Sequence, residues 1–246
     1  MTNNLLKLNN VTYFFRKDQL LISDFSYSIN ENEIITIVGK SGCGKSTILN
    51  LIAGLLKPIY GNIELKENNL VYLTQNPVLL EYRTALENCL LGLELRNEIN
   101  SENLIQVRKF FNEFELANTS LSKFPKELSG GMKQRIGIIQ SILIDSRLYL
   151  LDEPFTAIDS KTSRIIQTKI WELFKKNQYS ALIVSHDLEQ ALLLSDKILI
   201  MPSSDNKSSR EIILDKKFSA LSPEERKLSE KFNDYLLNII KAFNES

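Results

Sequence analysis

Apolar positions along the chain follow strand-like spacing in some regions and helix-like spacing in others. Short apolar or alternating runs predict strands over residues 5–15, 21–29, 33–38, 147–154, 180–186, 197–201 and 210–214. Residues 83–145 change to helical spacing, and Ser101 is expected to be the N-cap of a helix there. A further helical run covers 163–176. The simplest organisation is a strand-rich core that a helical segment interrupts.

The C-terminal residues 221–246 predict a separate amphipathic helix. Ser222 is expected to cap it, with Pro223 in the first turn and Glu225 completing a capping box. The apolar stripe of this helix consists of Leu228, Phe232, Leu236, Ile239 and Phe243. Such a stripe favours packing on the core of the protein, and contact with a partner or a membrane surface is the alternative.

The composition excludes several classes of protein. Thirty basic residues balance thirty acidic ones, so net charge provides no overall attraction to nucleic acid or anionic lipid. The apolar runs are too short to cross a bilayer, and the N-terminus lacks the pattern of a signal peptide. Two distant cysteines and one histidine form neither a disulfide framework nor a metal cluster. A reducing cytosol is the expected setting.

The segment GKSGCGKST at 39–47 matches the phosphate-binding P-loop, with Gly39, Gly44, Lys45 and Ser46 at the fixed positions. It follows an apolar strand and opens a helical run, which is the context that the motif requires. Glycines let backbone N–H groups approach phosphate oxygens, and the helix N-terminus adds partial positive charge. Lys45 is expected to bind the β- and γ-phosphates, and the Ser46 hydroxyl to ligate Mg²⁺. A chance glycine-rich turn is the alternative.

Two carboxylates follow the apolar strand residues 148–151. In P-loop proteins an aspartate at the position of Asp152 holds Mg²⁺ through the water shell of the metal. The adjacent Glu153 is then placed to act as general base on the attacking water. Two solvated acids at a strand end are the alternative, so this interpretation depends on the P-loop beside it.

The stretch LSGGMKQR at 128–135 resembles the signature of the ATP-binding subunits of ABC transporters. Other elements of that family occur in order: Gln75 resembles the Q-loop, Asp159 the D-loop and His186 the H-loop. The resemblance implies an α/β fold, with a RecA-like P-loop NTPase core, an antiparallel β subdomain and an inserted α-helical subdomain. The ABC ATPase domain is expected over 1–220, with its core at 1–82 and 146–220 and the helical subdomain at 83–145.

The resemblance also implies roles for single residues. Glu153, His186 and Gln75 are expected to act in catalysis, and Ser46, Gln75 and Asp152 at the metal. The nucleotide is expected to contact Phe15, Gly39, Lys40, Ser41, Gly42, Cys43, Gly44, Lys45, Ser46, Thr47, Ser129, Gly130, Gly131 and Asp159. His186 would donate a hydrogen bond to the γ-phosphate, and a core-packing histidine is the alternative. Phe15 would stack on adenine, and Tyr13 on the same strand face is the alternative.

The signature implies a dimer. Residues 129–131 begin a helical run, and a glycine-rich helix start is a second anion site. In the family this site faces the γ-phosphate bound to the P-loop of the partner subunit, so each ATP would be held between two subunits with Asp159 at the seam. The second subunit would be an identical chain or a close paralogue. Because Cys43 lies inside the phosphate loop, its alkylation is expected to block ATP binding.

The implied function is hydrolysis of ATP, with ATP and Mg²⁺ as cofactors, at the cytoplasmic face of the inner membrane. Residues 76–95, which follow Gln75, would receive the coupling helix of a separate permease subunit, and a solute-binding protein is a further expected partner. The sequence is most similar to the importers of nitrate, sulfonate, taurine or bicarbonate, which suggests a small anionic solute. Coupling to lipid or cell-envelope machinery, and a soluble ABC protein without a transport role, are the alternatives. No nucleic-acid partner is expected.

Overall fold

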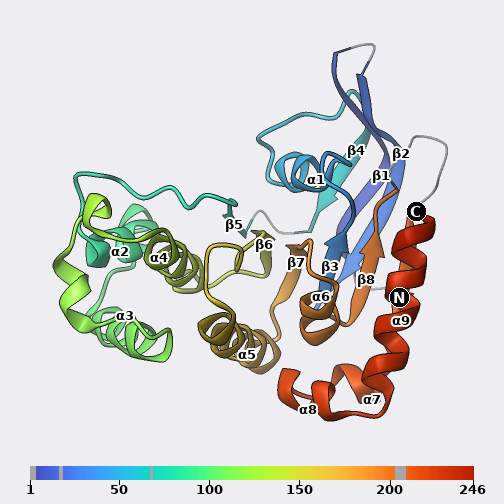
Figure 1. The fold of residues 1–246 in the computed structure, drawn as a ribbon. Helices are drawn as coiled ribbons and strands as arrows, with labels where there is room; N and C mark the ends of the chain where they lie inside the picture. Colours follow the sequence, from blue (N-terminus) through green and yellow to red (C-terminus); the bar gives the residue numbers. More distant parts are fainter. Residues whose placement is uncertain (1–3, 17–18, 67–68, 203–208) are drawn as a thin grey trace.

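The computed structural model describes residues 4–16, 19–66, 69–202 and 209–246, and two sheets organise them (Figure 1). The larger sheet has the strand order β5 (Leu70–Leu73), β6 (Leu148–Asp152), β7 (Ser180–Val184), β3 (Ile34–Val38), β8 (Lys197–Ile200) and β9 (Arg210–Ile213). Its first five strands are parallel, and β9 is an antiparallel edge strand. The smaller, antiparallel sheet has the order β2 (Gln19–Asn30), β1 (Asn4–Arg16) and β4 (Tyr60–Leu65).

The central strands are continuous apolar runs because both faces of the parallel sheet are buried. On one face, Ile35 and Leu150 belong to a core shared with α1 (Lys45–Ile52) and the antiparallel sheet. On the other face, Ile34 and Tyr149 join a core that includes α5 (Ser160–Asn177). Neighbouring residues of one strand therefore pack into the cores on opposite faces of the sheet, because side chains alternate along a strand. This arrangement confirms the α/β fold class.

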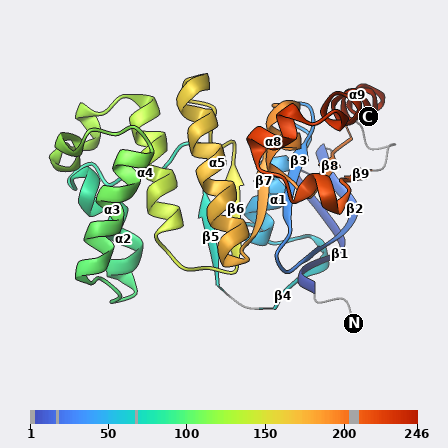
Figure 2. The same cartoon turned by 90° about the horizontal axis from the view of Figure 1, so that it is seen from below.

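A group of helices lies beside the β5 edge of the sheet (Figures 1 and 2). It contains α2 (Ala85–Leu95), α3 (Ser101–Glu113) and α4 (Gly130–Ile142), with two short 3-10 helices at Asn118–Ser122 and Pro125–Glu127. Asn100, not Ser101, caps α3. The Asn100 side chain accepts a hydrogen bond from the backbone of Asn103, and the Asn103 side chain accepts one from the backbone of Asn100. Ser101 cannot form the same reciprocal pair, because the residue three positions later is Leu104.

The C-terminal segment forms α7 (Lys216–Ser219), α8 (Pro223–Leu228) and α9 (Lys231–Glu245), so the prediction of one helix over 221–246 is wrong. The predicted capping box of Ser222 and Glu225 is present at the start of α8. The break after Leu228 has a packing reason. Arg226 and Phe232 are both buried, and on a straight helix their side chains would point about 120° apart.

The predicted apolar stripe is divided by this break. Phe232 and Ile239 are buried, and Leu236 and Phe243 pack partly against the same cluster on the outer side of α6 (Leu188–Leu194) and β8. Leu228 is 86% exposed and does not belong to the stripe that packs. Packing on the core is therefore confirmed for α9. Within the described ranges, no helix is both long and apolar enough to span a bilayer.

Candidate functional site

The carboxyl ends of β3, β5, β6 and β7 bring four predicted segments together. These strands are parallel neighbours, so their carboxyl ends meet at one edge of the sheet, where open α/β sheets bind ligands. The phosphate loop 39–47 follows β3, Gln75 follows β5, Glu153 follows β6 and His186 follows β7. The strand order thus places segments that are distant in sequence at one site.

The phosphate loop has the backbone geometry for which its glycines are needed. Gly44 has a φ of 97°, in the left-handed region that favours glycine. A Cβ at Gly39 would lie 2.7 Å from the Cys43 sulfur and 3.0 Å from the Met201 Cβ. The Lys45 ammonium donates hydrogen bonds to the carbonyl oxygens of Gly39 (2.8 Å) and Lys40 (2.9 Å). Its side chain therefore lies against the loop, and Lys45 lines the cavity described next.

A cavity of about 650 Å³ lies over this loop. It is lined by Phe15, Leu21, Gly39, Ser41, Gly42, Gly44, Lys45, Ser46, Thr47, Gln75, Glu153 and His186. Its volume is in the usual range of small-molecule sites. Lys40 and Cys43 belong to the loop but are not among the lining residues, and neither are the signature residues 129–131 nor Asp159.

The two aromatic candidates on β1 differ in exposure. Phe15 is 61% exposed and lines the cavity, whereas Tyr13 is 8% exposed and belongs to the core between the sheets. Their rings meet edge to face with centroids 5.2 Å apart. The buried Tyr13 thus packs against the Phe15 ring. Because Phe15 is exposed and lines the cavity, it is the ring that a ligand could contact.

Ser46 and Asp152 form a polar pair between the phosphate loop and β6. The Ser46 hydroxyl donates to an Asp152 carboxylate oxygen at 3.1 Å. Asp152 is buried, and this burial raises the pKa of its carboxyl, while the hydrogen bond from Ser46 opposes the rise and the nearby Glu153 charge adds to it. A hydroxyl and a carboxylate are the hard oxygen ligands that Mg²⁺ takes, and a divalent cation would offset the cost of the buried charge. The pair therefore fits this metal.

Glu153 is held in an unusual backbone conformation by several contacts. Its φ of 47° lies in the left-handed region, and its backbone N–H donates to the carbonyl of Val184 at 3.0 Å. The carboxylate oxygen Oε2 accepts hydrogen bonds from Gln75 Nε2 and Thr156 Oγ1, both at 3.1 Å. His186 Nδ1 lies 3.4 Å from the same oxygen. Three predicted catalytic residues thus meet at one atom.

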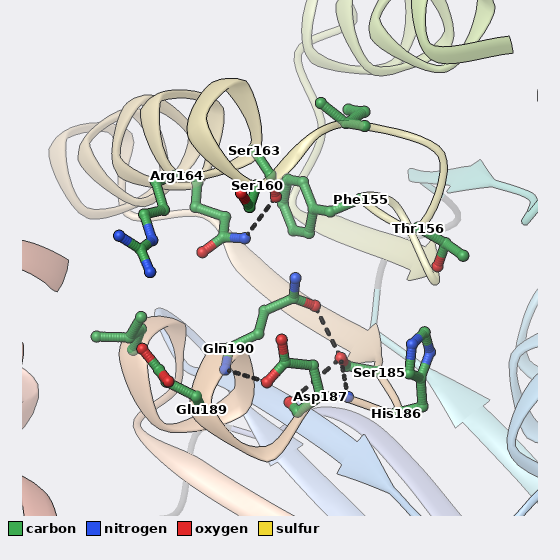
Figure 3. A pocket seen from close by; sticks show the side chains of 13 residues that line it. Phe155, Thr156, Ser160, Ser163, Arg164, Ser185, His186, Asp187, Glu189 and Gln190 are labelled. Atoms are coloured by element: carbon green, nitrogen blue, oxygen red, sulfur yellow. Dashed lines mark hydrogen bonds between the residues drawn. The ribbon is translucent and has the colours of Figure 1, made fainter.

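The loop after β7 orients His186 toward solvent. The Ser185 hydroxyl accepts from the backbone N–H of Asp187 (3.0 Å) and donates to Gln190 (2.7 Å), while the Asp187 carboxylate accepts from the backbone N–H of Gln190 (3.0 Å). Figure 3 shows this network in a second pocket of about 290 Å³, between the starts of α5 and α6. The His186 side chain is 63% exposed, so the alternative of a core-packing histidine is wrong.

The signature lies at the start of α4, on a surface apart from the cavity. Ser129 caps this helix by accepting from the backbone N–H of Met132 at 3.3 Å, and Ser129 and Gly130 are exposed. A Cβ at Gly131 would lie 2.9 Å from the carbonyl oxygen of Ala157, so a glycine is needed for this close approach. The nearby Asp159 is also exposed and caps α5 through the backbone N–H of Thr162 at 3.0 Å.

Three contacts near the carboxylates were not predicted. Thr156 donates to Glu153, and the Gln134 side chain donates to the carbonyl of Pro154 at 2.9 Å, which joins α4 to the loop after β6. Tyr72 lies next to Asp152, and burial and this carboxylate raise the pKa of the Tyr72 hydroxyl above its usual range. Gln134 lies within LSGGMKQR, so the signature motif could have identified this residue. Nothing local in the sequence singles out Thr156 or Tyr72.

Comparisons with known proteins agree on one family. The family model described as ABC transporter matches residues 22–156, which is more than half of the chain. The chain is 31% identical to the uncharacterized ABC transporter ATP-binding protein YtlC of Bacillus subtilis, covering 95% of this chain and 92% of that protein. It is 38% identical to the formylaminopyrimidine import ATP-binding protein ThiZ of Halalkalibacterium halodurans (81% and 80% covered). The taurine import ATP-binding protein TauB of Yersinia pestis is 34% identical, with 73% of each chain covered.

Solved structures support the same assignment. The dimeric, post-hydrolysis structure of the ATP-binding cassette MJ0796 bound to ADP and Pi matches with a TM-score of 0.76 and 28% identity. The match covers 85% of this chain and 99% of that one. Together with the convergence of the phosphate loop, Glu153 and His186 at one cavity, these matches show that the chain belongs to the ABC transporter family, as an ATP-binding ATPase cassette.

Proposed function

We propose that this chain is the ATP-hydrolysing subunit of an importer and powers uptake of a small anionic solute through separate membrane subunits. The observation that carries the proposal is the meeting of Gln75, Glu153 and His186 over the cavity of the phosphate loop. Import is supported by the names of two relatives, a formylaminopyrimidine import protein and a taurine import protein. Taurine carries an anionic sulfonate group beside its ammonium group, so this relative supports a solute with an anionic group.

The site residues divide the work of hydrolysis among them. Lys45 and the backbone N–H groups of the phosphate loop hold the phosphates of ATP, and the exposed Phe15 ring stacks on adenine. Ser46, Gln75 and Asp152 would hold Mg²⁺, which would neutralise charge on the phosphates. Glu153 orients the attacking water and accepts its proton, and His186 donates a hydrogen bond to the γ-phosphate.

A second copy of the chain, or a close paralogue, completes the site. Ser129, Gly130 and Asp159 are exposed and do not line the cavity of their own protomer. The backbone N–H groups of Gly130 and Gly131 lie at the glycine-rich start of α4, a place that suits a phosphate. We therefore assign the signature to the ATP on the partner subunit, with ATP holding the two copies together.

The permease is proposed to bind beside β5, where a groove of about 330 Å³ is lined by residues that include Pro77, Val78 and Arg96. Val78 and Tyr82 are 71% and 74% exposed. The fully buried Asn88 of α2 holds this loop, because its side chain accepts from the backbone N–H of Leu80 at 2.7 Å. A pre-ordered loop with exposed apolar side chains suits an incoming helix. Bound to the permease through this loop, the chain would lie at the cytoplasmic face of the membrane. A solute-binding protein would deliver the solute to this complex.

Association with a membrane partner tests this assignment. Val78→Asp and Tyr82→Asp are expected to release the chain from membranes and from any multi-span protein that copurifies with it. Ile105→Asp is the matched control, because Ile105 is 68% exposed on α3, outside the segment 76–95 that is proposed to contact the permease. A wild-type chain found only in the soluble fraction, with no membrane partner, would contradict the transport role.

The class of solute is tested in vesicles that contain the purified complex. We expect nitrate, bicarbonate or a sulfonate such as taurine to stimulate ATP hydrolysis. Neutral sugars should leave the rate of hydrolysis unchanged. Stimulation by lipid alone would instead favour the cell-envelope alternative. These measurements test the identity of the solute separately from the ATPase activity. The assignment of the ATPase activity does not depend on which solute stimulates it.

A further inference from the structure

Arg226 in α8 is a buried cation whose partners are backbone carbonyls. It is 0% exposed. Among the described residues, every hydrogen bond of its guanidinium goes to a carbonyl oxygen, namely those of Leu192 (3.0 Å), Ser195 (2.7 Å), Ser219 (2.5 Å) and Leu221 (3.1 Å). Burial lowers the pKa of this group to about 10. The charge of the nearby Asp196 opposes this shift, and the four carbonyl oxygens supply the hydrogen bonds that a buried guanidinium needs.

The contacts of α8 join two helices that are separate in sequence. Leu192 lies in the last turn of α6 and Ser195 directly follows it, and the Arg226 guanidinium lies 5.9 Å from the ring centroid of Trp171 in α5. Two neighbours on α8 repeat the pattern. Glu224 accepts a hydrogen bond from Thr168 of α5 at 2.5 Å, and Lys227 forms an ion pair with Glu189 of α6. Figure 1 shows α8 beside these two helices.

The starts of α5 and α6 adjoin residues of the proposed nucleotide site. Asp159 caps α5, and His186 directly precedes Asp187, the cap of α6. The starts of both helices line the pocket of Figure 3, which includes His186. Since α6 has seven residues, it is only about 10 Å long, and a shift at its end moves its start by a similar amount.

We propose that Arg226 is a positioning residue for ATP hydrolysis. By binding the carbonyls at the end of α6 while it packs on Trp171, its guanidinium sets the place of α6 relative to α5. It thereby sets the place of His186, which directly precedes the cap of α6, relative to Glu153, which lies in the loop between β6 and α5. The two side chains are 3.4 Å apart at their nearest polar atoms. The planar fork of arginine can bind several carbonyls at fixed directions, which a lysine cannot do. This inference rests on the proposed role of His186 in hydrolysis.

The test compares Arg226→Lys, Arg226→Met and His186→Ala in the full-length chain. The matched control is Lys231→Ala, which removes the ion pair between Lys231 and Asp215 in the same C-terminal segment without touching α5 or α6. Nucleotide stoichiometry and affinity, single-turnover hydrolysis of ATP, and amide hydrogen exchange at residues 185–194 are measured for each. The ratio of hydrolysis to binding distinguishes positioning from stability, because partial unfolding lowers both together.

We expect Arg226→Met to bind nucleotide with wild-type stoichiometry but to hydrolyse ATP about tenfold more slowly, with faster exchange at 185–194. Arg226→Lys should show a smaller loss, and Lys231→Ala should keep the wild-type ratio of hydrolysis to binding. Wild-type hydrolysis in the Arg226 variants, or equal losses of binding and hydrolysis, would overturn the inference. If Arg226→Met does not fold, Arg226→Lys decides by the same criteria. Wild-type hydrolysis by His186→Ala would overturn the proposed role of His186 itself, whatever the Arg226 variants do.

Discussion

The imidazole Nδ1 of His186 lies 3.4 Å from the carboxylate Oε2 of Glu153, although the two residues follow different strands. The contact exists because β6 and β7 are parallel neighbours and the backbone N–H of Glu153 bonds to the carbonyl of Val184. The left-handed backbone at Glu153 then turns its side chain toward the loop after β7. A proton acceptor and a hydrogen-bond donor thus line one cavity.

Glu153→Gln is expected to keep nucleotide binding and to lower the rate of ATP hydrolysis by about 10²–10⁴-fold, because an amide cannot accept the proton of the attacking water. With hydrolysis blocked, ATP should remain between two subunits and the dimer should accumulate. Size-exclusion chromatography with Mg-ATP and a phosphate-release assay measure both effects. A variant that stays monomeric and hydrolyses at the wild-type rate would contradict both the base and the shared site.

Lys45→Ala is expected to raise the Kd for ATP at least tenfold, since a charge-assisted hydrogen bond contributes about 1.5–3 kcal/mol. Equilibrium binding of a fluorescent ATP analogue measures this change. Lys40→Ala is the control, because Lys40 carries the same charge in the same loop but does not line the cavity. Equal losses of affinity in the two variants would point to general electrostatics of the loop instead of a specific phosphate contact.

Alkylation of Cys43 is expected to block ATP binding, because a bulky group on this partly exposed residue would crowd the phosphate loop. Its sulfur lies 3.9 Å from the Lys45 ammonium. Cys89 provides an internal control: it is 1% exposed, and burial raises the pKa of its thiol above the usual range, so it should remain unmodified. Mass spectrometry locates the label. Full ATPase activity after stoichiometric labelling of Cys43 would disprove the prediction.

Gly131→Ala is expected to destabilise the fold by about 1–3 kcal/mol, because the new methyl group would press on the backbone carbonyl of Ala157. Gly130→Ala is the matched control. A Cβ at Gly130 would have nothing within 4 Å, so this variant should unfold at nearly the wild-type urea concentration. Urea unfolding followed by circular dichroism compares the two, and equal stability would show that the contact with Ala157 relaxes without cost.

Asp215→Asn is expected to destabilise the C-terminal segment at neutral pH. The Lys231 ammonium, the backbone N–H of Phe218 and the Tyr235 hydroxyl lower the pKa of Asp215 well below its usual range. A lowered pKa stabilises the folded state above the unfolded pKa of about 3.9, and this contribution is lost as pH falls toward the folded pKa. The stability difference between wild type and variant should therefore shrink below about pH 4 in urea unfolding. A stability difference that does not change with pH would assign the effect to the role of Asp215 as the N-cap of α7 alone.

Much of the candidate site could be predicted from the sequence because its motifs are local. The phosphate loop needs glycines, a lysine and a serine at fixed spacing between a strand and a helix, and residues 39–47 contain all of these. Glu153 and His186 follow short apolar runs that could be recognised as buried strands. The capping box of Ser222 was predicted for the same reason, since it links residues only three positions apart.

Other features depended on packing between distant parts of the chain. The apolar spacing continues through Leu228 to Phe232, so it could not reveal the break between α8 and α9, which lies between the buried Arg226 and the buried Phe232. The choice of Phe15 over Tyr13 followed from which ring the antiparallel sheet buries. Hydrophobic periodicity and helix capping involve residues only a few positions apart, so they can be predicted from the sequence alone. The distance from His186 to Glu153 arises only when two strands pair, because strand order is decided by the whole core.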